Sequence, residues 1–108
     1  MELVKNLRYP LEVLTLVEIT ENAKSEFYEI KKQIPSLIKS YGIDLVYYGD
    51  VIKQREYDNN KKYDVCLILR FNDEFIHRQY IESHKTDETL KVLLKTIKSR
   101  YDIQLSEI

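Results

Sequence analysis

Several residue types that build specialised sites are scarce in this chain of 108 residues. The single cysteine, Cys66, has no second cysteine with which to form an internal disulfide bond. Two glycines are present, and the sequence has no glycine-rich phosphate loop, no serine-centred nucleophile elbow and no paired-cysteine motif. The composition therefore argues against disulfide scaffolds, P-loop nucleotide binders and serine hydrolases.

Long segments of one character are also missing. Seventeen basic and eighteen acidic residues nearly cancel, and neither sign forms a long block, so we expect no nucleic-acid partner. No window reaches the roughly 18 apolar residues that a membrane-spanning helix requires, and the start MELVKNLRYP has no apolar stretch typical of a signal peptide. With the lone cysteine placed within a predicted strand, these features favour a cytoplasmic protein that contacts no membrane.

The apolar residues that are present follow two periods. Alternation over 11–20, 43–56, 63–71 and 101–106 predicts four strands, whereas three- and four-residue steps over 23–41 and 75–97 predict helices. Pro35 lies inside the first helical pattern and predicts either a kink or a split into two helices. The order of elements is βαββαβ in a single domain, 1–108, with 1–10 as an N-terminal extension.

This order predicts the α+β class and a ferredoxin-like fold. We expect a four-stranded antiparallel sheet with the helices on one face. Within it, the first and third strands are expected to pair in parallel through a right-handed crossover.

The third strand decides which side of the sheet the helices cover. Its odd positions, from Tyr63 to Phe71, are almost purely apolar, so odd-numbered strand residues are assigned to the face under the helices. The even-numbered residues then lie on an open face: Leu14, Leu16, Glu18, Val46, Tyr48, Asp50, Ile52, Cys66, Ile68, Arg70, Asp102, Gln104 and Ser106.

The centre of this open face is too apolar to remain in water. We therefore expect a homodimer formed through it, with Leu14, Leu16, Val46 and Ile68 in the interface.

The turn between the second and third strands determines the neighbours of Arg70. Loops centred on Asn59 or Asn60 keep the two strands in phase and place Tyr48 or Asp50 opposite Arg70. The register around 58–60 stays open between these two.

The passage YDVCLILRFNDEFIHRQYIES resembles the dimeric α+β barrel superfamily. Tyr63, Asp64, Phe71, Asn72 and Tyr80 match its pattern of Tyr-Asp, apolar strand, Phe, small polar residue, helix and Tyr. The resemblance implies two sheets meeting across their open faces, and a ligand or active site between sheet and helices. Members include heme-degrading and quinol-forming monooxygenases, muconolactone-type isomerases, chlorite dismutase-like heme proteins, polyketide cyclases and stress-induced proteins.

The chain also departs from that superfamily. Many small relatives follow the helix Tyr with a small residue and then His-Pro-x-His, whereas here Tyr80 is followed by Ile81, Glu82, Ser83 and His84. The Asn-Trp-His set of the antibiotic-synthesis monooxygenases is missing, because the chain has no tryptophan. No named activity carries over, no cofactor is predicted, and heme stays open.

Four residues are candidates for ligand binding. Arg70 could hold a carboxylate or enolate, or it could form a structural ion pair with Glu18 or Asp50 or across a dimer interface. Tyr48 could donate a hydrogen bond to a ligand or simply pack. His84 could act as a general base, but His77 is its only histidine companion, and no metal site is predicted.

The candidate site is thus Arg70, Tyr48, Asp50 and His84. The predicted function is binding of a small, largely apolar organic ligand by a homodimer, with cofactor-independent oxygenase or isomerase chemistry if the protein is an enzyme. The alternative is a non-catalytic assembly or regulatory module whose open face only makes the oligomer interface.

Overall fold

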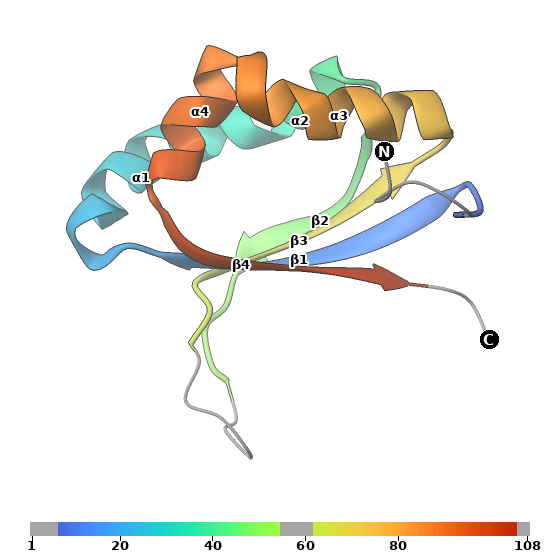
Figure 1. The fold of residues 1–108 in the computed structure, drawn as a ribbon. Coiled ribbons are helices and arrows are strands. Elements are labelled where there is room, and N and C mark those ends of the chain that lie inside the picture. The colour runs from blue at the N-terminus through green and yellow to red at the C-terminus, as the bar shows by residue number, and fades with distance from the viewer. Residues whose placement is uncertain (1–6, 55–61, 106–108) are drawn as a thin grey trace.

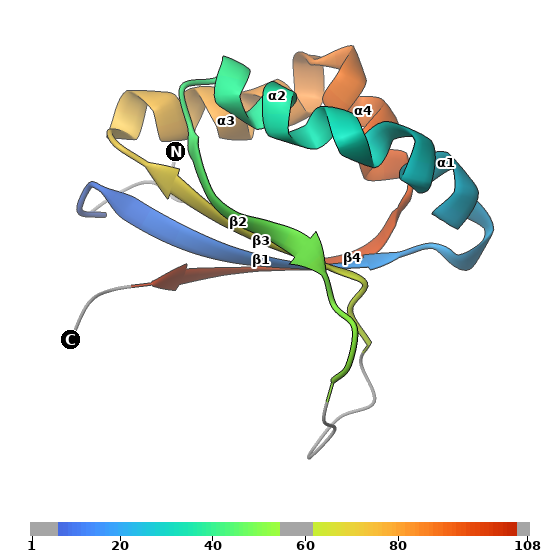
Figure 2. The same ribbon diagram turned by 180° about the vertical axis from the view of Figure 1, so that it is seen from behind.

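The computed structural model describes residues 7–54 and 62–105 as a sheet with helices packed on one face (Figures 1 and 2). The strands are β1 (Leu11–Ile19), β2 (Asp44–Asp50), β3 (Val65–Phe71) and β4 (Ile97–Leu105), in the spatial order β2-β3-β1-β4. Each neighbouring pair is antiparallel. The predicted α+β class and ferredoxin-like arrangement are confirmed.

The expected parallel pairing of the first and third strands is wrong. β1 and β3 are neighbours but run antiparallel, with Leu11 opposite Phe71 and Val17 opposite Val65. The strands that run the same way are β1 and β2, because each is antiparallel to β3, which lies between them. The helical crossover therefore connects β1 to β2, and the chain then returns through β3.

Pro35 splits the first helical segment. Helix α1 covers Lys24–Ile30, a 3₁₀ turn covers Lys31–Gln33, and α2 covers Ile34–Ser40 with Pro35 in its first turn. A proline fits there because the first backbone N–H groups of a helix have no intrahelical acceptor. The segment ends before Gly42, whose φ of 77° places it in the left-handed region.

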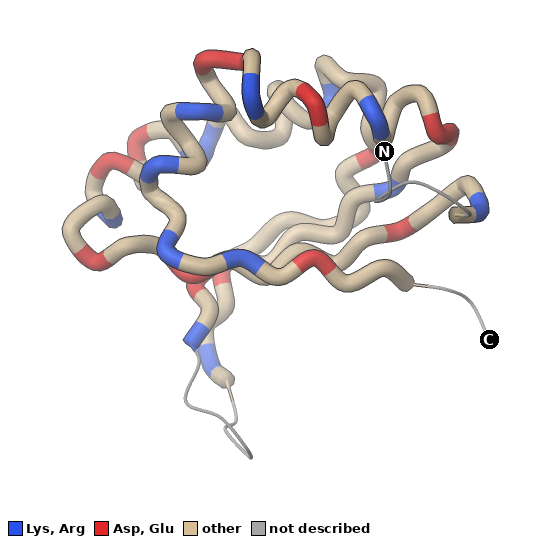
Figure 3. The backbone as a smooth tube through the Cα atoms, viewed as in Figure 1, with Lys and Arg blue, Asp and Glu red and all other residues tan. Residues whose placement is uncertain are grey.

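Two aspartates begin the helices of the second half. Helix α3 (Glu74–Thr86) starts after Asp73, whose carboxylate accepts from the Ile76 N–H at 2.8 Å. Helix α4 (Glu88–Lys95) starts after Asp87, which accepts from the N–H groups of Thr89 at 2.9 Å and Leu90 at 3.3 Å. These bonds satisfy donors that the first helical turn leaves free. Lysines, arginines and acidic residues are interspersed along the helical layer (Figure 3).

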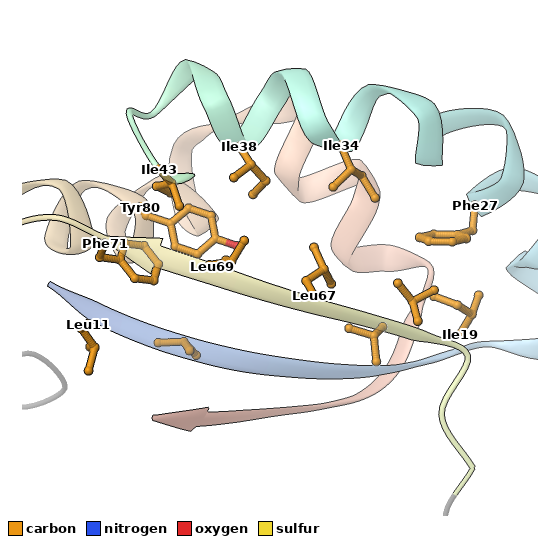
Figure 4. Close-up of a cluster of buried hydrophobic side chains, with 13 residues drawn as sticks. Leu11, Ile19, Phe27, Ile34, Ile38, Ile43, Leu67, Leu69, Phe71 and Tyr80 are labelled. Atoms are coloured by element: carbon orange, nitrogen blue, oxygen red, sulfur yellow. The ribbon is translucent and has the colours of Figure 1, made fainter. Parts of the chain in front are cut away.

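The core lies between the helices and the two central strands (Figure 4). The odd-numbered residues of β1 and β3 are buried, which confirms the predicted face for these strands. The buried apolar cluster comprises Leu11, Val13, Val17, Ile19, Phe27, Ile34, Ile38, Ile43, Val65, Leu67, Leu69, Phe71 and Tyr80.

The outer strand β2 changes phase at a bulge. Leu45 pairs with Leu69 but Tyr47 pairs with Ile68, so Val46 is the extra residue. Beyond it, Tyr48 and Asp50 lie opposite buried residues of β3 and share their helix-facing side. Their predicted place on the open face is therefore wrong. The residue opposite Arg70 is Asp44, and the predicted turn around 58–60 falls in 55–61, outside the described residues.

The other outer strand, β4, has the opposite phase to the prediction over 101–105, the described part of the predicted strand. Val13 pairs with Gln104, Thr15 with Asp102, and Val17 with Arg100, so these β4 residues face the helices. A further irregularity lies between Glu18, opposite Ser99, and Ile19, opposite Ile97. The assignment of Asp102 and Gln104 to the open face is wrong, and the residues that lie there are Tyr101, Ile103 and Leu105.

Candidate functional site

A cavity of about 380 Å³ lies between α3 and the side of the sheet formed by β3, β1 and β4. A smaller void of about 50 Å³ continues inward beneath α2 and α4. Thr15, Leu69, Tyr80, His84 and Arg100 line both spaces. Polar groups therefore stand where the outer cavity meets the apolar interior.

Arg100 is the charged centre of this region. Its Nε donates to Asp102 Oδ1 at 3.1 Å, and the Thr15 hydroxyl donates to the same oxygen at 2.7 Å. Only 23% of the Arg100 side chain is exposed. Burial alone would lower the pKa of Arg100, but Tyr80 and Asp102 outweigh it and raise the pKa, so the guanidinium keeps its charge.

His84 is held between Arg100 and its own helix. The Nδ1 atom lies 2.7 Å from the Tyr80 carbonyl oxygen, and Nε2 lies 3.0 Å from Arg100 Nη1. A carbonyl only accepts and a guanidinium only donates, so the proton sits on Nδ1 and the ring is neutral. Burial is the main cause that lowers the pKa of His84, and Arg100 lowers it further, in agreement with this assignment.

His77 lies deeper along α3, with 6% of its surface exposed. Its ring stacks on Phe71 at 4.3 Å between centroids, and Nδ1 is 2.8 Å from the Tyr9 hydroxyl oxygen. Burial lowers the pKa of His77. Tyr80, one helical turn further on, makes an edge contact with His84 at 4.7 Å, and burial raises the pKa of its hydroxyl.

The four sequence-predicted site residues do not come together. His84 lines the cavity. Tyr48 donates to the Lys31 carbonyl oxygen at 3.0 Å, burial raises its pKa to about 12, and Asp50 lies 3.6 Å from Lys31 Nζ. Arg70 is exposed on the opposite side of the sheet, opposite Glu12 on β1. The predicted ligand contacts of these residues stay predictions.

The proposed ion pairs of Arg70 with Glu18 or Asp50 are not formed. Glu18 instead pairs with Lys98 at 3.6 Å and accepts from Ser99 at 3.0 Å, while Asp50 pairs with Lys31. Across residues 7–54 and 62–105, no ion pair includes Arg70.

The sequence-based set of candidate site residues did not include Thr15, His77, Arg100 or Asp102. The available signal was Thr15, the only polar residue among the odd positions of LEVLTLVEI. A hydroxyl on an apolar strand face needs a hydrogen-bond partner, which here is Asp102.

The open face of the sheet is more apolar than predicted. Leu14, Leu16, Cys66 and Ile68 are partly buried there by their neighbours. The β4 residues Tyr101, Ile103 and Leu105 add side chains that are 42%, 44% and 38% exposed. Val46, predicted to join this surface, is exposed at the bulge. Burial raises the pKa of the Cys66 thiol, which keeps it protonated.

Two classes of feature are missing from the part of the chain that the structure describes. There, no three His, Cys, Asp or Glu side chains are grouped so that they could hold a metal ion. Within the same residues, no helix combines the length and apolar character needed to cross a membrane.

No protein-family model matches the chain, and no curated protein matches it. Several solved structures are similar to this one. The At3g17210 protein of Arabidopsis thaliana is 12% identical over 92% of this chain and 96% of its own, with a TM-score of 0.68. An uncharacterised NIPSNAP domain protein from Burkholderia xenovorans is 14% identical over 91% and 94%, with a TM-score of 0.60.

A third similar structure is a dimeric ferredoxin-like protein of unknown function from Thermobifida fusca. It is 11% identical over 95% of this chain and 97% of its own, with a TM-score of 0.56. Identities this low establish the fold alone. The chain therefore shares the ferredoxin-like α+β fold of these proteins.

Proposed function

We propose that this chain forms a homodimer that binds a small, largely apolar organic acid in the cavity under α3. The observation that carries the proposal is the position of Arg100, a mostly buried cation at the junction of a 380 Å³ cavity and the apolar interior. Cavities of this size suit small organic molecules, and a few polar groups among apolar walls orient such ligands. Arg100 anchors the ligand's carboxylate or enolate oxygen.

The guanidinium is held in place before any ligand arrives. Asp102 fixes Nε and His84 fixes Nη1, while Thr15 holds Asp102. A guanidinium has more N–H groups than the two that these bonds use. Because the side chain is already ordered, little additional conformational entropy is lost when an oxygen anion binds. This preorganisation supports recognition of an anion rather than a neutral molecule.

The homodimer is supported by the open face of the sheet. Leu14, Leu16, Ile68, Tyr101 and Ile103 form an apolar surface on the side away from the helices. A contiguous apolar surface of this kind marks an interaction site, and a self-complementary surface closes a two-fold dimer. The Thermobifida fusca protein of the same fold is described as dimeric.

The ligand site is tested with 2-naphthoate and its uncharged analogue 2-naphthamide, titrated by calorimetry. Arg100→Gln removes the charge but keeps hydrogen-bonding capacity. We expect it to weaken naphthoate binding about tenfold or more, since a charge-assisted hydrogen bond contributes about 1.5–3 kcal/mol. Naphthamide binding should change little.

Arg70→Gln is the matched comparison on the opposite side of the sheet. If this variant rather than Arg100→Gln loses naphthoate binding, the ligand contacts the open face, as the sequence-based prediction has it, and the cavity proposal is wrong. Native mass spectrometry of the protein as purified tests whether a small molecule (a passenger) stays bound through purification. A dimer that binds neither probe and carries no passenger would favour the assembly module.

A further inference from the structure

His77 has one ring nitrogen that the surrounding structure leaves available. The contact with Tyr9 uses Nδ1, and stacking on Phe71 fixes the plane of the ring. Among the described residues, no hydrogen-bond partner contacts Nε2. All fully buried polar side-chain atoms among these residues have partners, so Nε2 is not completely buried, and His77 lines the 380 Å³ cavity.

His84, the other histidine of this cavity, differs in this respect. Both of its nitrogens are engaged, Nδ1 with the Tyr80 carbonyl and Nε2 with Arg100. A proton could reach Nε2 of His84 only if the Arg100 bond broke. The two histidines therefore have different roles. His84 positions the Arg100 guanidinium, whereas His77 has a ring nitrogen, Nε2, with no hydrogen-bond partner among the described residues.

We infer that His77 is the acid–base group of this cavity and transfers a proton at a carbon next to the oxygen that Arg100 holds. The inference rests on the ligand site proposed above. Nε2 removes a proton from a carbon adjacent to a carbonyl group. The C–H electron pair becomes the carbon–carbon double bond of an enolate, whose oxygen carries the charge beside Arg100. Return of the proton to oxygen or to another carbon restores neutral His77, so the isomerisation needs no oxidant or cofactor.

The groups around His77 suit this role. The chain before β1 contributes Tyr9, β3 contributes the uncharged Phe71, and β4 contributes Arg100 and Asp102. On its own helix α3, Glu74 and Arg78 pair with each other, at 3.4 Å, and Asp73 caps the helix. Burial lowers the pKa of His77, and Asp102 opposes that change. The ring is therefore neutral at pH 7, and Tyr9 can accept from Nδ1–H when Nε2 acts as the base.

The probe for this chemistry is 5-nitrobenzisoxazole. A base removes its ring proton, the C–H electron pair forms a nitrile as the N–O bond breaks, and the charge ends on the coloured 2-cyano-4-nitrophenolate. The reaction requires a base for the proton, and a cation beside the oxygen stabilises the charge that develops there, so it tests both groups inferred here. We expect saturable turnover by the dimer, faster than with an equal concentration of free imidazole.

Two variants separate the base from the anchor. His77→Gln should lower kcat about 100-fold, within the range typical of a lost general base, while the Kd of the phenolate product stays within about twofold. Arg100→Gln should instead raise that Kd about tenfold. Equal kcat in the wild type and His77→Gln would overturn the inference.

The pH profile of the wild type provides an independent measurement if His77→Gln does not fold. The rate should rise with deprotonation of one group and level off, with its midpoint below the ordinary histidine pKa of 6.5. A rate that rises in proportion to hydroxide would overturn the inference. If the wild type binds the phenolate but is no faster than imidazole, the acid–base role fails and the ligand site stands. If the phenolate does not bind, both fail.

Discussion

A chain of hydrogen bonds joins three elements around the cavity. It runs from Thr15 on β1 through Asp102 and Arg100 on β4 to His84 on α3, and ends at the Tyr80 carbonyl. Such networks are stable only when every member has a partner, because an unpaired buried group costs about 1–3 kcal/mol. Protonation of His84 would replace its acceptor with a donor aimed at Arg100.

This arrangement predicts how stability depends on pH. The pKa of His84 is lowered in the folded protein, so below about pH 6.5 the unfolded chain takes up a proton that the folded chain resists. The free energy of unfolding should therefore fall as the pH drops from about 7 to about 5. His84→Gln removes this contribution and should lose less stability over the same interval, as measured by urea unfolding.

His77 provides the internal comparison for that experiment. Its pKa is lowered as well, so His84→Gln should keep a residual pH dependence. An unfolding free energy that falls equally in the wild type and in His84→Gln would show that His84 titrates alike in the folded and unfolded chains.

At the scale of elements, two local devices direct the chain. Pro35 lies in the first turn of α2, and Gly42 follows the end of this helix and turns the chain toward β2. On β2, a Cβ at Gly49 would lie 2.6 Å from the hydroxyl oxygen of Tyr47, the end of an exposed side chain that would have to move. Glycine and proline are rare in this chain, and Pro35 and Gly42 stand where the backbone conformation favours them.

Gly42→Ala should destabilise the protein by about 1 kcal/mol, the cost of a left-handed conformation for a residue with a Cβ. The new Cβ would meet Ile76 Cδ1 at 3.5 Å, an ordinary contact, so the effect comes from the backbone. Gly42→Asn is the control and should lose less, because asparagine tolerates this region better. Chemical denaturation of the three proteins checks this, and an alanine variant as stable as the wild type would contradict it.

The order of elements and the central strands could be predicted from the sequence because their signals are local. Val, Leu and Ile occupy most odd positions of β1 and β3, which indicates the buried face of these strands. Pro35 itself indicates where the first helical segment is interrupted. For the outer strands β2 and β4, the sequence did not predict which residues face the helices. The inward-facing set in these strands depends on irregularities in the strand pairing. Val46 has no sequence feature that separates it from its neighbours, and no sequence feature indicates the irregularity in β4. The site was missed for the same reason, since Arg100 and Asp102 are on β4.

At the scale of the molecule, the sheet has one covered and one uncovered side (Figures 1 and 2). The helices bury the odd positions of β1 and β3, and the 380 Å³ cavity lies on that side. The opposite side presents the apolar surface that we assign to the dimer. The ligand binding and self-association that we propose therefore use different faces of the same strands, and single substitutions can separate them.

Ile68→Asp should convert the dimer to a monomer at low micromolar concentration while the secondary structure stays formed. Ile68 lies on the central strand β3, opposite Leu14 and Tyr47, and a carboxylate there would be costly to bury. Val92→Asp, on the exposed surface of α4, is the matched control and should stay dimeric. Sedimentation and circular dichroism measure the two properties. An Ile68→Asp protein that remains dimeric would rule out this face as the interface.

The irregular residues of β2 and β4 also bear on how this protein can be compared with others of its fold. A gain or loss of one residue at Val46 exchanges the inward and outward sets of side chains beyond it without any substitution. In proteins that share the fold at 11–15% identity, residues aligned on these two strands can thus point to opposite sides. Transfer of function by aligned position is therefore least secure at the edges of the sheet, where this chain keeps Arg100 and Asp102.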